Sequence, residues 1–185
     1  MPDIMQELQH DHINVAKLLD LMRFELDALR AGQEVDYPLL FDIMHYMRHY
    51  PDRFHHPREE LVFAKLVRRD SGSRAAVATL RSQHEECATL GAALIDTLHR
   101  ATQERDTAAE TLCDPCMRYV DLLYGHMNEE EGTVFPLARA LLTRADWDDI
   151  ATSLQCDVDP LIAPELQVAY RSIARALAGG TRQRP

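Results

Sequence analysis

Hydrophobic residues recur along most of the chain at alternating steps of three and four, which is the spacing of one face of an α-helix. The first series contains Met5, Leu8, His12, Val15, Leu19, Met22, Leu26 and Leu29. Two later series contain Val77, Leu80, His84, Cys87, Gly91, Leu94 and Leu98, and then Cys116, Tyr119, Leu123, His126 and Glu130. No segment shows a convincing strand pattern, so the spacing predicts an all-α protein.

The second predicted helix carries prolines in its interior. Its inward series begins near Asp36–Pro38 with Leu40, Ile43 and Met47, and resumes with His56, Glu60, Phe63 and Val67. A proline inside a helix removes one backbone hydrogen bond and displaces the preceding turn. We therefore expect Pro51 and Pro57 to kink or briefly break this helix.

Capping and turn residues divide the chain into four long helices. The candidate caps and stops are Asp3, Gly32, Ser71 or Ser73, and Asp114 with Pro115. Four such helices joined by short turns predict an up-down-up-down four-helix bundle over residues 1–143. Residues 144–185 are predicted to pack on the bundle, as a short helix capped by Asp146 and a longer one from about Pro164.

Composition adds limits on function. The chain has 185 residues, 46% of them hydrophobic, which suits one domain with a proper core. Its formal net charge is −10 and it has no Lys/Arg run, which disfavours nucleic acid and anionic membrane surfaces. No apolar run approaches membrane-spanning length and the N-terminus lacks an apolar signal core, so we expect a cytoplasmic protein.

The cysteines do not indicate a thiolate metal site. Among Cys87, Cys113, Cys116 and Cys156 there is one C-x-x-C pair, whereas a zinc site of this kind needs a second pair. A redox dithiol is usually found after a strand, and no strand is predicted. The simpler interpretation is a helix start at Asp114–Pro115 followed by small buried residues.

Each predicted helix instead carries histidine or glutamate on its inward face. The candidate set is His12, His56, Glu60, His84, His126 and Glu130. An unpaired carboxylate in an apolar interior costs several kcal/mol, so these residues would make a poor core unless a cation joined them. A metal centre is therefore predicted.

The candidate residues also form a repeat. His56 follows His12 by 44 residues, and His126 follows His84 by 42, so each half of the chain reads as a helix pair with half of the ligands. In His-x-x-x-Glu the two side chains stack on one helix face. Glu60 and Glu130 are the natural bridging pair, and six donors over-fill one tetrahedral zinc site, which favours two ions.

The choice of histidine in "HHPREE" stays open. His55 and His56 lie about 100° apart around a helix, so both cannot point inward. His56 with Glu60 matches the second copy, while a local break at Pro57 would favour His55 with Glu59. Imidazole and carboxylate donors suit iron or manganese, with zinc tolerated.

At these residues the chain resembles the hemerythrin-like, or HHE cation-binding, domain family. The stretches "YPDRFHHPREELVF" and "HMNEEEGTVFP" are similar to its two signature segments, and the resemblance covers roughly residues 5–142. It implies a four-helix bundle around two non-haem iron ions, with His12, His56, Glu60, His84, His126 and Glu130 as ligands. Manganese or zinc is the lesser expectation.

Two departures refine the expected function. Oxygen-carrying hemerythrins have a second histidine where this chain has Ala88, and an aspartate where it has Glu131. The resemblance therefore points away from the oxygen carriers and toward iron-sensing, iron–sulfur-repair and peroxide-handling members of the family. The expected function is a di-iron protein that reacts with or senses O2, NO or peroxide. The alternatives are a di-iron enzyme, for peroxide dismutation or iron–sulfur repair, and a metal-dependent sensing or interaction module. The expected partner is a small diatomic ligand or peroxide.

Overall fold

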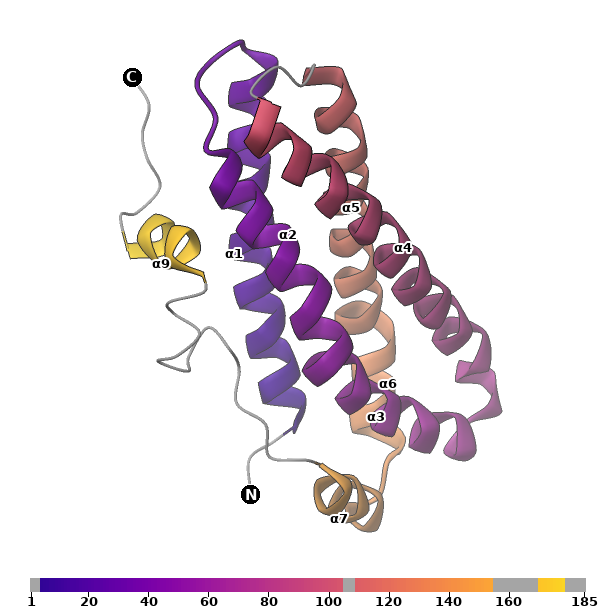
Figure 1. Cartoon of the computed structure of the whole chain (residues 1–185). Coiled ribbons are helices and arrows are strands. Elements are labelled where there is room, and N and C mark those ends of the chain that lie inside the picture. The colour runs from indigo at the N-terminus through magenta and orange to yellow at the C-terminus, as the bar shows by residue number, and fades with distance from the viewer. Residues whose placement is uncertain (1–3, 105–108, 155–169, 179–185) are drawn as a thin grey trace.

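A computed structural model gives the fold and describes residues 4–104, 109–154 and 170–178. All regular structure in these ranges is helical, which confirms the all-α prediction (Figure 1). The helices of the main body are α1 (Ile4–Arg30), α2 (Tyr37–Tyr50), α3 (His56–Arg69), α4 (Arg74–Glu104), α5 (Ala109–Glu129) and the short α6 (Phe135–Leu141). Short turns are η1 (Pro51–His55), η2 (Ser71–Ser73) and η3 (Glu130–Val134), and α7 (Arg144–Ser153) and α9 (Arg171–Ala178) follow.

The long helices lie side by side, with α2 continuing through η1 into α3 and α5 through η3 into α6 (Figure 1). Helix α1 packs against α5 and α2, and α4 packs against α2 and α5. Of the later helices, α7 contacts α3 and α9 contacts α2. Among the described helices, none combines the length and apolar content needed to cross a membrane.

The connection after α1 is formed by the residues that the sequence indicated. Gly32 has a φ of 68°, a conformation that glycine adopts without strain. The N–H of Gln33 donates to the carbonyl of Ala28, and the N–H of Gly32 donates to that of Leu29, which closes the helix end. The carboxylate of Asp36 then accepts from the N–H of Leu39 and caps α2.

Two predicted helix starts are wrong. Pro115 lies inside α5, which begins at Ala109, so Asp114 does not cap that helix and pairs with Arg30 instead. A proline in this place costs one hydrogen bond, which the packing of a long helix offsets. Helix α7 is capped by Thr143, with Asp146 as the third residue of a reciprocal capping box. Asp3 and Pro164 lie outside the described residues.

The prolines shift the helix register without ending the helix. In η1 the N–H of His56 donates to the carbonyl of Pro51, five residues back, and in η3 the N–H of Phe135 donates to that of Glu130. Each π-helical turn ends two residues before a proline, Pro57 or Pro136. A π-turn holds one extra residue, so the face that follows is rotated by about 100° relative to a continuous α-helix. The expected interruption at Pro51–Pro57 takes this form.

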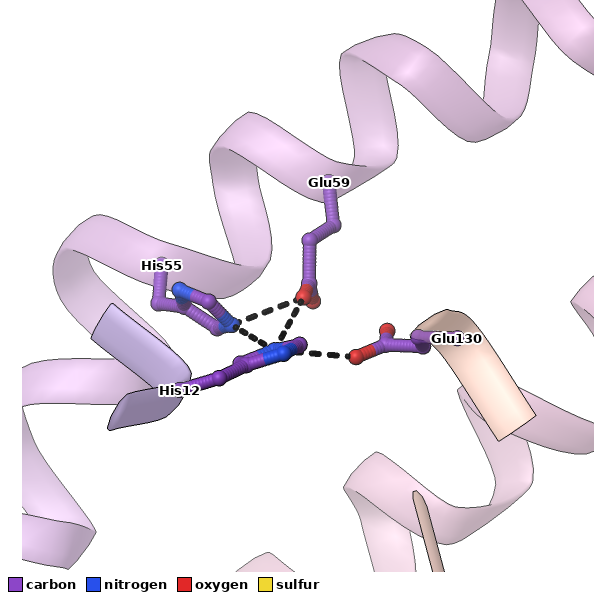
Figure 2. A group of neighbouring side chains, drawn as sticks. All are labelled: His12, His55, Glu59 and Glu130. Atoms are coloured by element: carbon purple, nitrogen blue, oxygen red, sulfur yellow. Dashed lines mark hydrogen bonds and ion pairs between the residues drawn. The ribbon is translucent and has the colours of Figure 1, made fainter. Parts of the chain in front are cut away.

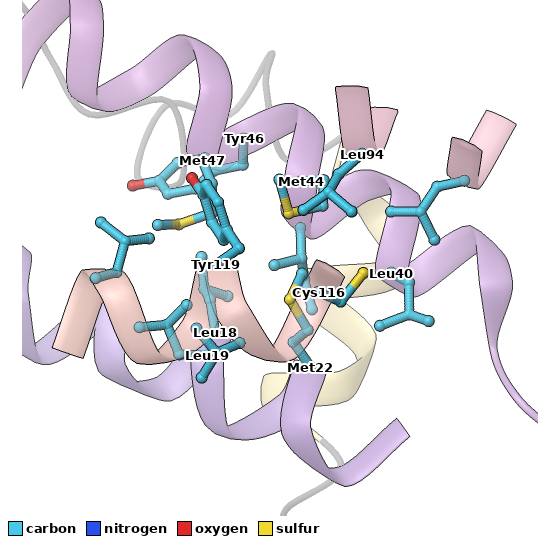
Figure 3. Close-up of a cluster of buried hydrophobic side chains, with 14 of the residues drawn as sticks. Leu18, Leu19, Met22, Leu40, Met44, Tyr46, Met47, Leu94, Cys116 and Tyr119 are labelled. Carbon is cyan, nitrogen blue, oxygen red and sulfur yellow. The ribbon is translucent and has the colours of Figure 1, made fainter. Parts of the chain in front are cut away.

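The apolar core is divided into two clusters. The larger one contains Leu18, Leu19, Met22, Leu40, Met44 and Tyr119, among others (Figure 3). The smaller one contains Met5, Leu8, Phe63, Leu66, Leu80 and Phe135, among others. Along each long helix, a short stretch containing the candidate metal ligands separates residues of one cluster from residues of the other. A polar layer thus crosses the protein between two apolar regions.

The three described cysteines belong to the apolar interior. Cys87, Cys113 and Cys116 are buried free thiols. Burial raises the pKa of Cys87 and of Cys116 to about 12, so both are protonated at neutral pH. Cys156 lies outside the described residues.

The capping box of α7 yields a stability prediction. Thr143→Ala removes a side-chain acceptor from the first turn and should lower the free energy of unfolding by about 1 kcal/mol. Thr79→Ala is the control, because the Thr79 hydroxyl donates only to the Ala75 carbonyl on an exposed face of α4. Urea unfolding should show the loss in the first variant alone; equal effects in both would contradict the capping role.

Candidate metal centre

Six inward side chains form the polar layer between the two apolar clusters. His12 comes from α1, His55 from the end of η1, Glu59 from α3, His84 from α4, His126 from α5 and Glu130 from the start of η3. Figure 2 shows four of them, with one nitrogen of His12 directed toward Glu59 and Glu130 and one nitrogen of His55 directed toward Glu59. Residues that are far apart in the sequence thus present their donor atoms to one small volume.

The structure corrects two of the expected positions. His55 and Glu59 occupy the interior in place of His56 and Glu60. The Glu60 carboxylate instead lies at the surface, where the guanidinium of Arg81 donates to it at 2.7 and 2.9 Å. The physical reason is the π-turn before His56, which adds one residue and shifts the inward face onto His55 and Glu59. The sequence analysis left this alternative open on account of Pro57.

The structure brings the other four candidates together. His12, His126 and Glu130 are buried, and His84 is nearly so. The Nε2 atoms of His12 and His55 lie 3.1 Å apart, and those of His84 and His126 lie 3.0 Å apart. The inward nitrogens therefore form two pairs, one from α1 and η1 and one from α4 and α5.

Each carboxylate reaches both histidine pairs. Glu59 places Oε1 2.7 Å from His55 Nε2 and Oε2 3.4 Å from His84 Nε2. Glu130 places Oε2 3.2 Å from His12 Nε2 and Oε1 3.3 Å from His126 Nε2. Donor atoms bound to one ion at about 2.0–2.2 Å lie about 3–3.5 Å from one another. The observed spacing is therefore that of donors around shared ions.

The carboxylate oxygens lack hydrogen bonds. Glu59 and Glu130 are both 0% exposed, and none of their four oxygens has a hydrogen-bond partner among the described residues. The imidazole nitrogens come close without the alignment that a hydrogen bond requires. Because a buried anion without compensation costs several kcal/mol, a positive charge is needed between the two carboxylates.

Three of the four histidines are held by their outer nitrogen. His12 Nδ1 donates to Glu131 Oε1 at 2.8 Å, and His55 Nδ1 to Asp11 Oδ2 at 3.1 Å. His126 Nδ1 donates to Gln83 Oε1 at 3.0 Å. A proton on Nδ1 leaves a lone pair on Nε2, so neutral imidazoles in this arrangement present their lone pairs to the interior.

The pKa shifts show how strongly the site attracts positive charge. Burial alone would lower the pKa of His12, but its contacts with Glu130 and Glu59 outweigh burial and raise it to about 9. Burial is likewise outweighed at His55, where the charge of Glu59 and the bond to Asp11 raise the pKa to about 10. Protons on these rings thus offset the carboxylates when no other cation does.

His56 behaves differently from these two residues. Burial lowers its pKa to about 3, against the charge of Glu59, and the neighbouring histidines add to the decrease. Its ring stacks on that of His84, with centroids 3.8 Å apart and an angle of 18° between the planes. His56 is therefore a neutral ring beside the centre and outside the two donor sets.

The donor atoms fall into two sets that share both glutamates. We call the first metal position the set His12, His55, Glu59 and Glu130, and the second metal position the set Glu59, His84, His126 and Glu130. Within each set, one donor atom from every residue lies within 4.8 Å of all the others. Two imidazoles and two carboxylate oxygens at each position suit a divalent transition-metal ion, so the residues present fit a two-metal centre.

The residues that bond the outer nitrogens were not among the candidates predicted from the sequence. Asp11 and Gln83 had no signal beyond standing one residue before His12 and His84, and Glu131 stood out only as a departure from the oxygen carriers. Two other polar residues near the predicted ligands in sequence, His49 and Glu85, are exposed, and His49 donates to the carbonyl of His45.

Comparison with known proteins agrees with this geometry. A family model described as the hemerythrin HHE cation-binding domain matches residues 3–138. Uncharacterised proteins from Mycobacterium bovis and Mycobacterium tuberculosis are 23% identical over 152 residues, which is 81% of this chain and 59% of each relative. The chain thus spans less than two thirds of the length of these relatives.

The corrected register predicts opposite results for adjacent glutamates. Glu59→Gln removes a charge shared by both metal positions and should cost at least one bound metal ion per chain. Glu60→Gln, the matched control, removes only a surface ion pair and should leave metal content unchanged, with a stability loss below about 1 kcal/mol. Elemental analysis of both purified variants tests this; metal loss in Glu60→Gln alone would reverse the assignment.

Proposed function

Because the chain belongs to the hemerythrin HHE cation-binding domain family, we propose that it binds two non-haem iron ions and uses them to react with, or sense, O2, NO or peroxide. The two donor sets that share Glu59 and Glu130 carry this proposal. His12 and His55 would hold one ion, His84 and His126 would hold the other, and Glu59 and Glu130 would supply carboxylate oxygens to both. Residues 1–143 form an up-down-up-down four-helix bundle around the centre, and residues 144–185 pack on it.

The bridging role rests on the contacts of the carboxylates. Each glutamate has one oxygen near a histidine of the first metal position and the other oxygen near a histidine of the second. A buried carboxylate without hydrogen bonds is costly, and binding two divalent ions removes that cost at both residues. The metal ions take the place of the extra protons on His12 and His55 in offsetting the carboxylates. Metal binding therefore releases protons.

Iron is favoured over other metals by the donor set. Neutral imidazole with carboxylate suits iron or manganese, and no thiolate lies among the six donors. A pair of iron ions supplies reversible one-electron changes and binding of small ligands at open positions. The chain's own residues hold the centre apart from water: Phe135 stacks on His12, with ring centroids 5.5 Å apart, and the two apolar clusters close the layer on either side.

An enzymatic role is the second candidate. Its supporting observation is Ala88, which stands where oxygen carriers of this family have a further histidine, so each position has two imidazoles. Fewer protein ligands leave more room for a substrate such as peroxide. Oxygen evolution from peroxide by the iron-loaded protein, lost in Glu130→Ala, would favour this role over binding alone.

Metal content and stability provide one test. Protein purified without an affinity tag should contain close to two iron ions per chain. If the free metal concentration is about 1,000 times the Kd, removal of one ion lowers the free energy of unfolding by about 4 kcal/mol. For a chain of this size, that loss lowers Tm by roughly 10 °C. Differential scanning calorimetry before and after chelation measures the shift. Protein that contains no transition metal and whose Tm is insensitive to chelators would refute the proposal.

Reactivity provides a separate test. The absorption spectrum of the reduced, iron-loaded protein should change on exposure to air or to NO, because a reducible centre with open positions alters its charge-transfer bands. Glu60→Gln should show the same change and Glu59→Gln should not. An absorption spectrum of the wild-type protein that does not change on exposure to air or NO would indicate a structural site or a zinc site.

A further inference from the structure

We propose that the two metal positions hold their ions unequally: the second metal position is the weaker one, exchanges its ion first, and depends on His56 to position His84. This inference rests on the proposed function, since it concerns the same two ions. It is drawn from the residues that surround the donor sets, which differ between the two positions although the donors themselves are alike.

The first metal position is supported by two additional carboxylates. Glu131 accepts from His12 Nδ1 and Asp11 accepts from His55 Nδ1. A carboxylate at the outer nitrogen makes the inner nitrogen a stronger donor and fixes the ring. Arg58 lies 3.7 Å from Asp11 and offsets part of its charge, but its longer contact leaves the bond to His55 in place.

The second metal position has no such carboxylates among the described residues. His126 Nδ1 donates to the neutral amide of Gln83, and Nδ1 of His84 has no hydrogen-bond partner in the described parts of the chain. The His84 side chain is 13% exposed, whereas those of His12, His55 and His126 are 5%, 7% and 3% exposed. The second metal position therefore has fewer negative charges around it, its histidine rings have fewer hydrogen bonds, and one of them is nearer to solvent.

Stacking takes the place of the missing hydrogen bond at His84. The His56 ring lies almost parallel to that of His84 at 3.8 Å between centroids, and edge-on to His126 at 6.4 Å. A parallel neighbour restricts rotation of the His84 ring through face contact, without placing a nitrogen in the donor set. His56 is therefore a positioning residue for the second metal position, supplied by the same π-turn that turns His55 inward.

The expected size of the difference follows from known effects of such partners. Loss of one hydrogen-bonding partner behind a metal-bound histidine typically costs about 10–100-fold in metal affinity. Titration of the metal-free protein with Co²⁺, in competition with a chelator, should therefore show two steps separated by at least roughly 10-fold. Repulsion between neighbouring ions also separates the steps of two equal positions, so variants must assign them.

Gln83→Glu gives the assignment. A carboxylate behind His126 should tighten the weaker step by about 10-fold and leave the tighter step unchanged. Gln103→Glu, on an exposed part of the same helix, is the control for charge and should change neither step. If the two positions were equal, the altered one would fill first and the tighter step would move instead, which would overturn the inference. Asp11→Asn should weaken the tighter step only.

His56 is tested by two substitutions. His56→Phe keeps a ring against His84 and should leave the weaker step within about threefold, whereas His56→Ala should weaken it by about 10-fold. His49 is an exposed histidine of α2, seven residues before His56. His49→Ala should leave both binding steps unchanged. Equal losses in His56→Phe and His56→Ala would show that His56 is a ligand and would overturn the positioning role.

The outcomes separate this inference from the proposed function. Wild-type protein that takes up no Co²⁺ would remove the proposed function, and this inference with it. Two ions bound with a Gln83→Glu effect on the tighter step, or with no effect of any of these variants, would leave the two-metal centre standing and refute only the inequality. Circular dichroism of each metal-free variant confirms that the helices are retained.

Discussion

The structure depends on a pair of carboxylates in an interior that cannot hold them uncompensated. Glu59 and Glu130 are fully buried and face one another across two pairs of imidazoles. Two apolar clusters border this layer, and both carboxylates are 0% exposed, so bulk water does not contact their oxygens. Cations can offset these charges, and the helices bring six donors into one layer that could hold them.

Much of this arrangement could be predicted from the sequence. The helical spacing of apolar residues predicted the all-α fold. The inward positions of His12, His84 and His126 predicted where the polar layer crosses the helices. Which residues of α3 face inward could not be predicted. The positions of Pro51 and Pro57 show that the helix is interrupted, but the periodicity does not show how the chain accommodates them. A continuous α-helix from Met47 would turn Phe54 and Arg58 inward. The π-turn adds one residue, so the inward positions fall on His55 and Glu59, and not on the expected His56 and Glu60.

The residues behind the donors were also beyond periodicity. Asp11 and Gln83 each precede a histidine by one residue, yet each accepts a hydrogen bond from a histidine of another helical segment. Asp11 bonds His55, and Gln83 bonds His126. Such pairings depend on the relative height and rotation of two helices, which a single sequence does not contain. They nevertheless distinguish the surroundings of the two donor sets, which the proposed difference in metal affinity depends on.

The most direct test of this account is anomalous X-ray diffraction from crystals of the iron-loaded protein, collected at the iron edge. The account predicts two peaks of iron density within the polar layer, one beside His12 and His55 and one beside His84 and His126, with Glu59 and Glu130 between them. A single peak, or density beside Glu60 at the protein surface, would contradict it.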